Sequence, residues 1–136
     1  MNAKDYLNKA YWLDQRINSK LEQIESLNAL ATKASSTLSD MPRSPNRATS
    51  KMADAIDKMI DLQTEINKDI DMLVDLKAEI VETIKSVKNQ EYQTLLEKRY
   101  LCFETWEQIA VGMNYSLRWV HNLHGKALND LNDILN

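Results

Sequence analysis

Glycine, proline and cysteine are scarce in this sequence. Its 136 residues include 2 glycines, 2 prolines and 1 cysteine. This scarcity leaves little with which to build sheets or long loops, and it predicts an all-α fold. The single cysteine, Cys102, excludes an internal disulfide and a cysteine-based zinc site, and it fits a reducing compartment. Beside Phe103, we expect Cys102 to be a small buried hydrophobe, with a reactive thiol as the alternative.

Long apolar runs are missing as well. No run approaches the roughly eighteen apolar residues that a membrane span needs, so we expect no membrane protein. Residues 1–20 mix both charges and lack a continuous apolar core, which is unlike a secretory signal. We therefore expect a cytoplasmic protein. The content of 27% charged and 43% hydrophobic residues suits helices with one apolar stripe each.

Apolar residues recur in steps of three and four from residue 6 to about residue 38, which predicts one long amphipathic helix. The stripe consists of Tyr6, Ala10, Leu13, Ile17, Leu21, Ile24, Leu27, Ala31, Ala34 and Leu38. With no glycine or proline to interrupt it, this helix would run about 50 Å. A single stripe of that length needs a partner.

The stretch 35–50 is dense in serine, proline and asparagine. Pro42 and Pro45 cannot lie in a helix interior, and the residue before each is pushed towards an extended conformation. We therefore predict the bend of a helical hairpin at about residues 39–50. Arg43 and Arg47 make this bend the most basic spot of the chain. It is expected to be a solvated loop, with contact to nucleic acid or to an acidic surface as the alternative.

From residue 51 to residue 87 apolar residues stand seven apart, which is typical of a coiled coil. These positions are Met52, Met59, Ile66, Leu73, Ile80 and Val87, and Ile56, Leu62, Ile70, Leu76 and Ile84 lie between them. The two long helices should pair as an antiparallel hairpin. Its predicted seam includes Leu13, Ile17, Ile24, Met59, Ile66, Leu73 and Ile80.

One helix pair buries only a thin seam, so we expect a second copy to complete a four-helix bundle and form a homodimer. Acidic residues, Asp69 among them, run along the second helix. A carboxylate metal site in a bundle needs Glu-x-x-His pairs, and no histidine precedes His121. These acidic residues are expected to form a solvated face.

Residues 105–128 carry the capping signals of two short helices joined by a turn. Thr105 and Gln108 have the spacing of a capping box, so a helix should begin just after Thr105. Asn114 stands at the turn position that favours a positive φ. Ser116 is placed to cap the second helix.

The spacing of apolar and polar residues in this stretch is typical of a helix-turn-helix, whose second helix meets DNA. The predicted inward residues are Ile109, Ala110, Met113, Tyr115, Val120 and Leu123. The predicted DNA-binding residues are Ser116, Leu117, Arg118, His121, Asn122, Gly125 and Lys126. Arginine suits guanine or phosphate, asparagine suits adenine, and glycine allows close approach of DNA or another helix. Trp119 is expected to pack rather than to stack on bases. The alternative is a small helical pair that packs elsewhere and binds no DNA.

A short helix opening at Glu91, with Leu95, Leu96 and Tyr100 inward, completes the predicted helix-turn-helix domain. After the motif the apolar stripe continues to the last residues, which would pack on the hairpin or on its second copy. These residues are Ala127, Leu128, Leu131, Ile134 and Leu135. We predict two domains, a hairpin over 1–88 and a helix-turn-helix domain over 89–136.

Sequence signals for catalysis or cofactor binding are absent. His121 and His124 are three apart on one helix, but no third ligand stands at a matching spacing, so no metal is expected. The chain has no glycine-rich phosphate loop and no defensible Ser/His/Asp arrangement. We expect neither catalytic residues nor a cofactor, and no enzyme.

Positive charge is in deficit. The formal net charge is −3; residues 89–136 contain 4 Lys and Arg against 6 Asp and Glu. DNA-binding proteins usually carry a basic surplus, because neutralised phosphates release counterions. The positive charges of the second domain are Lys98, Arg99, Arg118 and Lys126. A single domain of this charge should bind DNA weakly unless a dimer doubles it or a partner brings it there.

Residues 92–131 resemble the fourth conserved region of bacterial sigma factors. The specific elements are LL and RY at 95–96 and 99–100, WEQIA at 106–110, MNYS at 113–116 and LHGKAL at 123–128. The whole chain, including LDQRINSKLEQI and SDMPRSPNR, is similar to the sigma-region-4-like proteins of Gram-positive prophages, related to the ArpU-type late transcription regulators. That resemblance implies control of phage genes through double-stranded promoter DNA, with RNA polymerase as a candidate partner.

We therefore expect a bacteriophage transcription regulator whose helix-turn-helix is dimerised or tethered through a coiled-coil hairpin. The alternative is a non-catalytic interaction protein, in which the acidic hairpin binds a host or defence protein such as RNA polymerase or a nuclease. In that case the second domain would not bind DNA.

Overall fold

The computed structural model describes residues 2–40 and 45–136, with side chains left undescribed at 34–40 and 45–49. This part of the chain contains five helices and no strand, which confirms the all-α prediction. Within the same ranges, no helix combines the length and apolar character required to cross a membrane.

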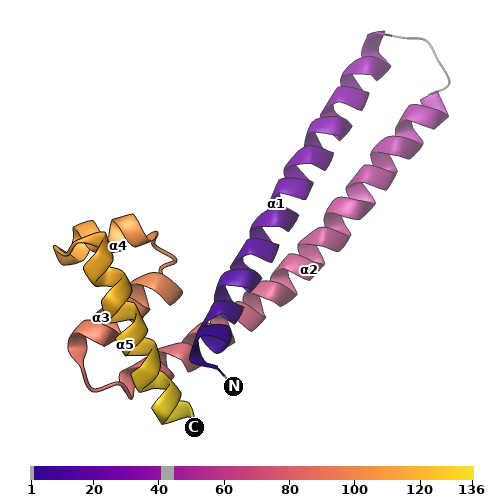
Figure 1. The fold of residues 1–136 in the computed structure, drawn as a ribbon. Helices are drawn as coiled ribbons and strands as arrows, with labels where there is room; N and C mark the ends of the chain where they lie inside the picture. The colour runs from indigo at the N-terminus through magenta and orange to yellow at the C-terminus, as the bar shows by residue number, and fades with distance from the viewer. Residues whose placement is uncertain (1, 41–44) are drawn as a thin grey trace. The chain divides into compact units, whose positions relative to one another are not determined.

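The helices are α1 (Ala3–Asp40), α2 (Pro45–Lys85), α3 (Gln90–Tyr100), α4 (Trp106–Met113) and α5 (Leu117–Leu135), as drawn in Figure 1. Helix α2 begins earlier than the sequence pattern predicts, because its proline stands at the first helical position, where the missing N–H loses no bond. The predicted bend residues Pro42 and Arg43 lie outside the described residues.

The chain divides by its contacts into two compact units. Residues 1–14 and 73–136 form one, called here the head unit, and residues 15–72 form the other, called the arm unit. The first turns of α1 and the last turns of α2 therefore group with the three C-terminal helices. The division predicted from the sequence was instead placed between residues 88 and 89.

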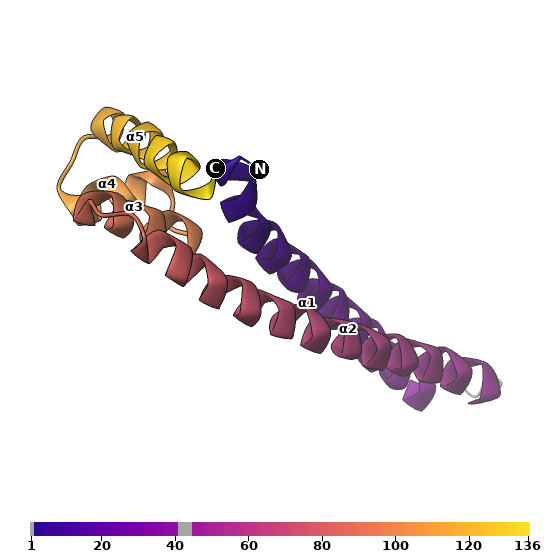
Figure 2. The ribbon, with the colours of Figure 1, turned by 90° about the horizontal axis from the view of Figure 1, so that it is seen from below.

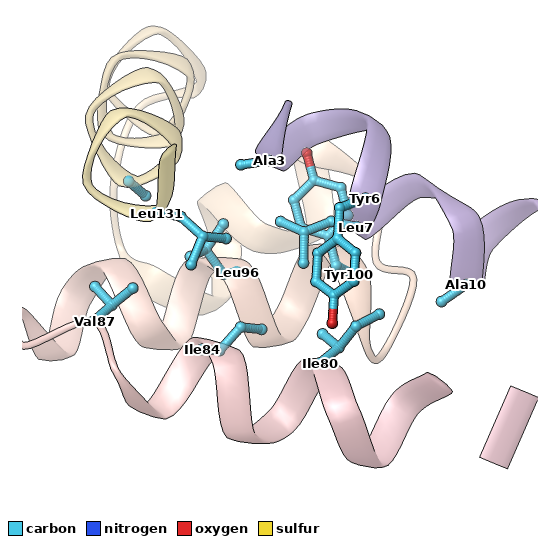
Figure 3. Packing of buried hydrophobic residues seen from close by; sticks show 11 residues of the cluster. Ala3, Tyr6, Leu7, Ala10, Ile80, Ile84, Val87, Leu96, Tyr100 and Leu131 are labelled. Atoms are coloured by element: carbon cyan, nitrogen blue, oxygen red, sulfur yellow. The ribbon is translucent and has the colours of Figure 1, made fainter. Parts of the chain in front are cut away.

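The larger core of the head unit joins four helices (Figure 3). Its buried side chains are Ala3, Tyr6, Leu7 and Ala10 of α1, Ile80 and Ile84 of α2 with the following Val87, Leu96 and Tyr100 of α3, and Ala127 and Leu131 of α5. The backbone N–H of Ala3 also donates to Oδ1 of Asn132 at 2.8 Å. The C-terminal part of α5 therefore packs on the ends of α1 and α2, as one of the two predicted alternatives has it.

The link between α3 and α4 carries a strained residue. Phe103 has a φ of 56°, a left-handed conformation that is rare for an aromatic residue. Its ring contacts that of Tyr11, with centroids 5.9 Å apart, and Nζ of Lys77 lies 4.6 Å from its centroid. The neighbouring Cys102 is exposed, so the prediction of a buried cysteine is wrong. Its neighbour Phe103, and not Cys102, supplies the apolar contact at this link.

In the arm unit, α1 and α2 lie side by side and run in opposite directions (Figures 1 and 2). Of the predicted seam residues, Leu13, Ile17, Ile66 and Ile80 are buried and Ile24, Met59 and Leu73 are half-buried. Those from 17 to 66 belong to the arm unit, and the other three to the head unit.

A charged pair lies between α1 and α2, close to residues 15 and 72, the two ends of the arm unit's segment. Nζ of Lys20 lies 2.6 Å from Oδ2 of Asp69, and the two side chains are only 15% and 7% exposed. Leu21 and Ile70, which the apolar pattern places in the stripes, are 45% and 41% exposed. Both placements are therefore wrong, and so is the solvated position predicted for Asp69.

The heptad spacing explains this shift. Residue 20 stands seven after Leu13 and residue 69 stands seven after Leu62, whereas Leu21 and Ile70 stand eight after them. A residue seven further along a helix returns to the same face. The charged residues therefore lie in line with the seam, where each neutralises the other.

Candidate nucleic-acid interface

Helix α4 begins where its capping residues predict. Oγ1 of Thr105 accepts from the backbone N–H of Gln108 at 3.1 Å, and Oε1 of Gln108 accepts from the backbone N–H of Thr105 at 2.8 Å. This reciprocal capping box satisfies two N–H groups that a helix start leaves open. The capping box and the helix start at Trp106 are confirmed.

The turn between α4 and α5 depends on one left-handed residue. Asn114 has φ 62° and ψ 38°, as predicted for this position. The reversal lets the N–H of Tyr115 donate to the carbonyl of Ala110 at 3.0 Å. Oγ of Ser116 then accepts from the N–H of Trp119 at 3.1 Å, which confirms Ser116 as the cap of α5. Capping and turn residues thus fix the angle at which α5 leaves α4.

A second, smaller core holds α3, α4 and α5 together. Its buried members are Leu95, Ile109, Ala110, Val120 and Leu123, and Tyr92, Trp106, Met113 and Tyr115 pack against them. Four of the six predicted inward residues are thus buried, and Met113 and Tyr115 are half-buried.

The half-buried position of Tyr115 has a polar reason. Its hydroxyl donates to Oε1 of Glu91 at 2.8 Å, which ties the turn to the first turn of α3. The bond stabilises the protonated phenol and raises the pKa of Tyr115.

The predicted DNA-binding residues lie on the exposed side of α5 and at its cap. All seven are exposed: Ser116, Leu117, Arg118, His121, Asn122, Gly125 and Lys126. Arg118 and Asn122 stand one turn apart, and neither side chain makes a hydrogen bond or ion pair with the described part of the chain. Their polar atoms are therefore free to bind another molecule.

Gly125 stands in open space. A Cβ added there would meet no atom within 4 Å among the described residues. Close packing of another helix of the same described chain therefore does not explain this glycine. Approach by DNA, the other explanation that the sequence offered, stays a prediction.

Two of the four positive charges in residues 89–136 are engaged within the head unit. Lys98 pairs with Glu104 at 3.7 Å, and Arg99 donates to the backbone carbonyl of Glu104 at 2.9 Å. The guanidinium of Arg99 also lies 4.2 Å from the ring centroid of Trp106. Arg118 and Lys126, both exposed on α5, are then the charges best placed to meet phosphate.

His121 and His124 have different surroundings. The ring of His121 lies on that of Trp106, with centroids 4.8 Å apart, and the residue is exposed. His124 is buried, and its Nε2 lies 2.6 Å from the hydroxyl of Tyr100. Over the described ranges, no three His, Cys, Asp or Glu side chains gather closely enough to hold a metal ion.

Trp119 is a candidate contact residue that the sequence analysis missed. It is 41% exposed, and the sequence analysis predicted only that it packs rather than stacks on bases. Its ring meets that of Tyr115 edge-on at 6.4 Å, and Nζ of Lys126 lies 5.3 Å from its centroid. The sequence feature that could have indicated this role is the spacing of seven between Trp119 and Lys126, which puts an aromatic ring and a positive charge on one side of α5.

No family model matches the chain, and no curated protein or solved structure is significantly similar to it. The resemblance to sigma region 4 therefore rests on the residues of this sequence alone.

Proposed function

We propose that this protein is a DNA-binding transcription regulator of phage or prophage type. In this proposal α4, the turn and α5 act as a helix-turn-helix of the sigma-region-4 kind, and α5 enters a major groove. The observation that carries the proposal is that Arg118 and Asn122, on the first turns of α5, are exposed and that their side chains have no hydrogen-bond or ion-pair partner in the described part of the chain. In a helix-turn-helix, residues near the start of the second helix contact the base edges.

Each exposed side chain of α5 has a role that its chemistry suits. Arg118 would bind O6 and N7 of guanine, Asn122 would bind N6 and N7 of adenine, and Leu117 would contact a thymine methyl group. The hydroxyl of Ser116 and the ammonium of Lys126 would lie near phosphates. His121, placed by its contact with Trp106, would face the same groove.

Electrostatics argue against a single head unit acting alone. The net charge of −3 gives little general attraction to phosphate, so one α5 should bind weakly. In the proposed mechanism, α1 and α2 form a coiled-coil hairpin that overcomes this weakness. The hairpin either joins a second copy, which doubles the reading helices, or tethers the protein to a partner such as RNA polymerase.

The test is a gel-shift titration with late promoter fragments of the source phage, at low salt, with and without RNA polymerase. We expect a shift that Arg118→Ala abolishes. Lys88→Ala is a matched control, because it removes an exposed positive charge outside α5 and should leave the shift in place. If no condition gives a shift, the protein does not bind promoter DNA.

A second candidate function is a non-catalytic interaction protein. It is favoured by the arm unit, which exposes large apolar side chains such as Ile60 at 59% and Met72 at 51%. Here the arm would bind a host or defence protein and α5 would bind no DNA. Phage gene expression that depends on Ile60 but is unaffected by Arg118→Ala would favour this function over the first.

A further inference from the structure

Helix α2 carries a second apolar stripe that does not face α1. Its apolar members are exposed: Ile56 by 43%, Ile60 by 59%, Ile70 by 41% and Val74 by 61%. Gln63 and Asn67 stand between them, so the stripe is Ile56, Ile60, Gln63, Asn67, Ile70 and Val74. Steps of four and three keep these six residues on one side of the helix.

The position of the stripe around α2 follows from its register. Each member directly follows a buried or half-buried residue, as Ile60 follows Met59 and Ile70 follows Asp69. One residue turns an α-helix by about 100°, so the stripe lies about a quarter turn from the side that meets α1. A helix in a four-helix bundle contacts two neighbours at such an angle.

The stripe is symmetric along the helix. Its members pair outward from residue 65, as Gln63 with Asn67, Ile60 with Ile70, and Ile56 with Val74. Each pair joins residues of matching character, amide with amide and β-branched apolar with β-branched apolar. A surface of this kind is complementary to itself under a two-fold rotation, the symmetry of an isologous dimer.

We propose that a second copy of this chain covers the stripe, with α2 packed antiparallel on α2 of the other copy and the two-fold axis at residue 65. Ile60 of one copy then meets Ile70 of the other, and Ile56 meets Val74. This pairing removes four exposed apolar side chains per chain from water.

The polar centre of the stripe fits the same axis. Within one chain, Nε2 of Gln63 donates to Oδ1 of Asn67 at 3.2 Å. This bond leaves the carbonyl of Gln63 and the amide N–H groups of Asn67 available. Across the axis, Asn67 of each copy donates to Gln63 of the other, which closes a ring of four side chains. A buried amide pair among apolar residues fixes the register of paired helices.

One edge of the stripe carries like charges. The axis at residue 65 brings Asp57 of one copy near Asp71 of the other, twice in the dimer. Their repulsion weakens the association at low salt, and added salt screens it. Asp57→Lys places opposite charges there and strengthens the dimer. Asp54→Lys makes the same charge change on another side of α2 and leaves the dimer unchanged.

The role of this dimer rests on the proposed function, because the second copy supplies the second α5 that would bind DNA. The association itself is measured without DNA, so its failure is distinguishable from a failure of DNA binding.

Sedimentation equilibrium of the full chain tests the proposal. At micromolar concentration in moderate salt we expect twice the chain mass of 15.7 kDa. Ile60→Glu with Ile70→Glu should reduce the mass to that of one chain, while circular dichroism shows unchanged helix content. Met72→Glu is the matched control, because Met72 is exposed by 51% on the opposite side of α2 and its loss should leave the dimer intact.

A wild-type mass of one chain, or an unchanged dimer in the double variant, would overturn the proposal. If the wild type is a monomer and needs Ile60 and Ile70 to bind a different protein, that protein and not a second copy covers the stripe.

Cross-linking tests the orientation of the pair. In a Cys102→Ser background, Ile60→Cys mixed with Ile70→Cys should form disulfide-linked dimers, because the antiparallel axis places these residues opposite each other. Neither variant alone should cross-link, since the two copies of residue 60 lie about 15 Å apart along the helices. Self-cross-linking of each variant, with none between the two variants, would indicate a parallel pair and contradict the axis.

Discussion

Tyr100 and His124 share a short hydrogen bond in the head unit, with the phenol oxygen 2.6 Å from Nε2 of the imidazole. Burial raises the pKa of Tyr100 to about 12 and lowers the pKa of His124 to about 4. The imidazole is therefore neutral at pH 7, and the hydrogen bond joins a protonated phenol to an uncharged ring. The bond joins α3 to α5, the helix that carries the proposed reading face.

The stability of the protein should fall as pH decreases from 7 to 5. The pKa of His124 is about 4 when folded and 6.5 as a free side chain, so the unfolded chain takes up the proton first. The contribution of neutral His124 to the free energy of unfolding is complete above pH 6.5. It is lost as pH falls towards 4, and the total loss is on the order of 3 kcal/mol. Besides burial, the positive groups Lys4, Arg99 and His121 lower this pKa. Urea unfolding at a series of pH values measures the loss.

Two variants separate His124 from other titrating groups. His124→Gln should flatten the pH dependence between 7 and 5, because no proton is then taken up at this position. His121→Gln, which changes the exposed histidine three residues earlier, should alter the slope much less, because His121 makes the smallest contribution to the lowered pKa of His124. Equal slopes in all three proteins would show that the His124 pair does not govern the pH dependence.

The ion pair between Lys20 and Asp69 should be costly to break on one side only. Either Lys20→Leu or Asp69→Leu leaves a largely buried charge without its partner, and we expect a loss of about 3 kcal/mol in the free energy of unfolding. The double leucine variant should recover most of that loss, because both charges are then gone. A double-mutant cycle by urea unfolding measures the coupling, and additive effects would contradict it.

These two charges also show where sequence prediction stopped. The pattern of apolar residues was sufficient to predict the long helices and most of their buried positions. It selected Leu21 and Ile70 because they are apolar, although the spacing of seven from Leu13 and Leu62 selects Lys20 and Asp69. A charged residue can be predicted at such a position only when its partner is known. The pairing of two distant segments cannot be seen in the sequence of either segment.

Local signals were more reliable in the candidate interface. Thr105, Asn114 and Ser116 act through atoms within a few residues of themselves, so their positions in the sequence predict their hydrogen bonds. The exposed ring of Trp119 and the buried bond of His124 depend on contacts between α3, α4 and α5. For that reason the sequence alone did not predict them.

Asn114 offers a direct test of the turn. Its φ of 62° is tolerated by glycine and asparagine and strained for other residues. Asn114→Gly should leave the melting temperature nearly unchanged, whereas Asn114→Val should cost about 1–2 kcal/mol. Val111→Ala is the control: this valine lies in α4 and is exposed by 80%, so its replacement should have little effect. Equal stability of the glycine and valine variants would mean that the turn tolerates another conformation.

The salt dependence of DNA binding should separate phosphate contacts from base contacts on α5. Each neutralised phosphate contributes a slope of about −0.9 to log K against log salt. Lys126→Ala should therefore make the slope shallower by about 1 for each α5 on the DNA, or by about 2 when both copies of a dimer bind. The size of the change counts the bound heads. Titration of one promoter fragment at several salt concentrations measures it.

Asn122→Ala should act differently, because the proposed contact of Asn122 is a base edge and carries no charge. We expect weaker binding by about 1–3 kcal/mol at one base position, with the slope against salt unchanged. The expected weakening disappears when the adenine at that position is replaced in the fragment, since the wild type then loses the same contact. If Lys126→Ala leaves the slope as it is and Asn122→Ala weakens binding to all sequences alike, α5 does not enter the groove in the proposed orientation.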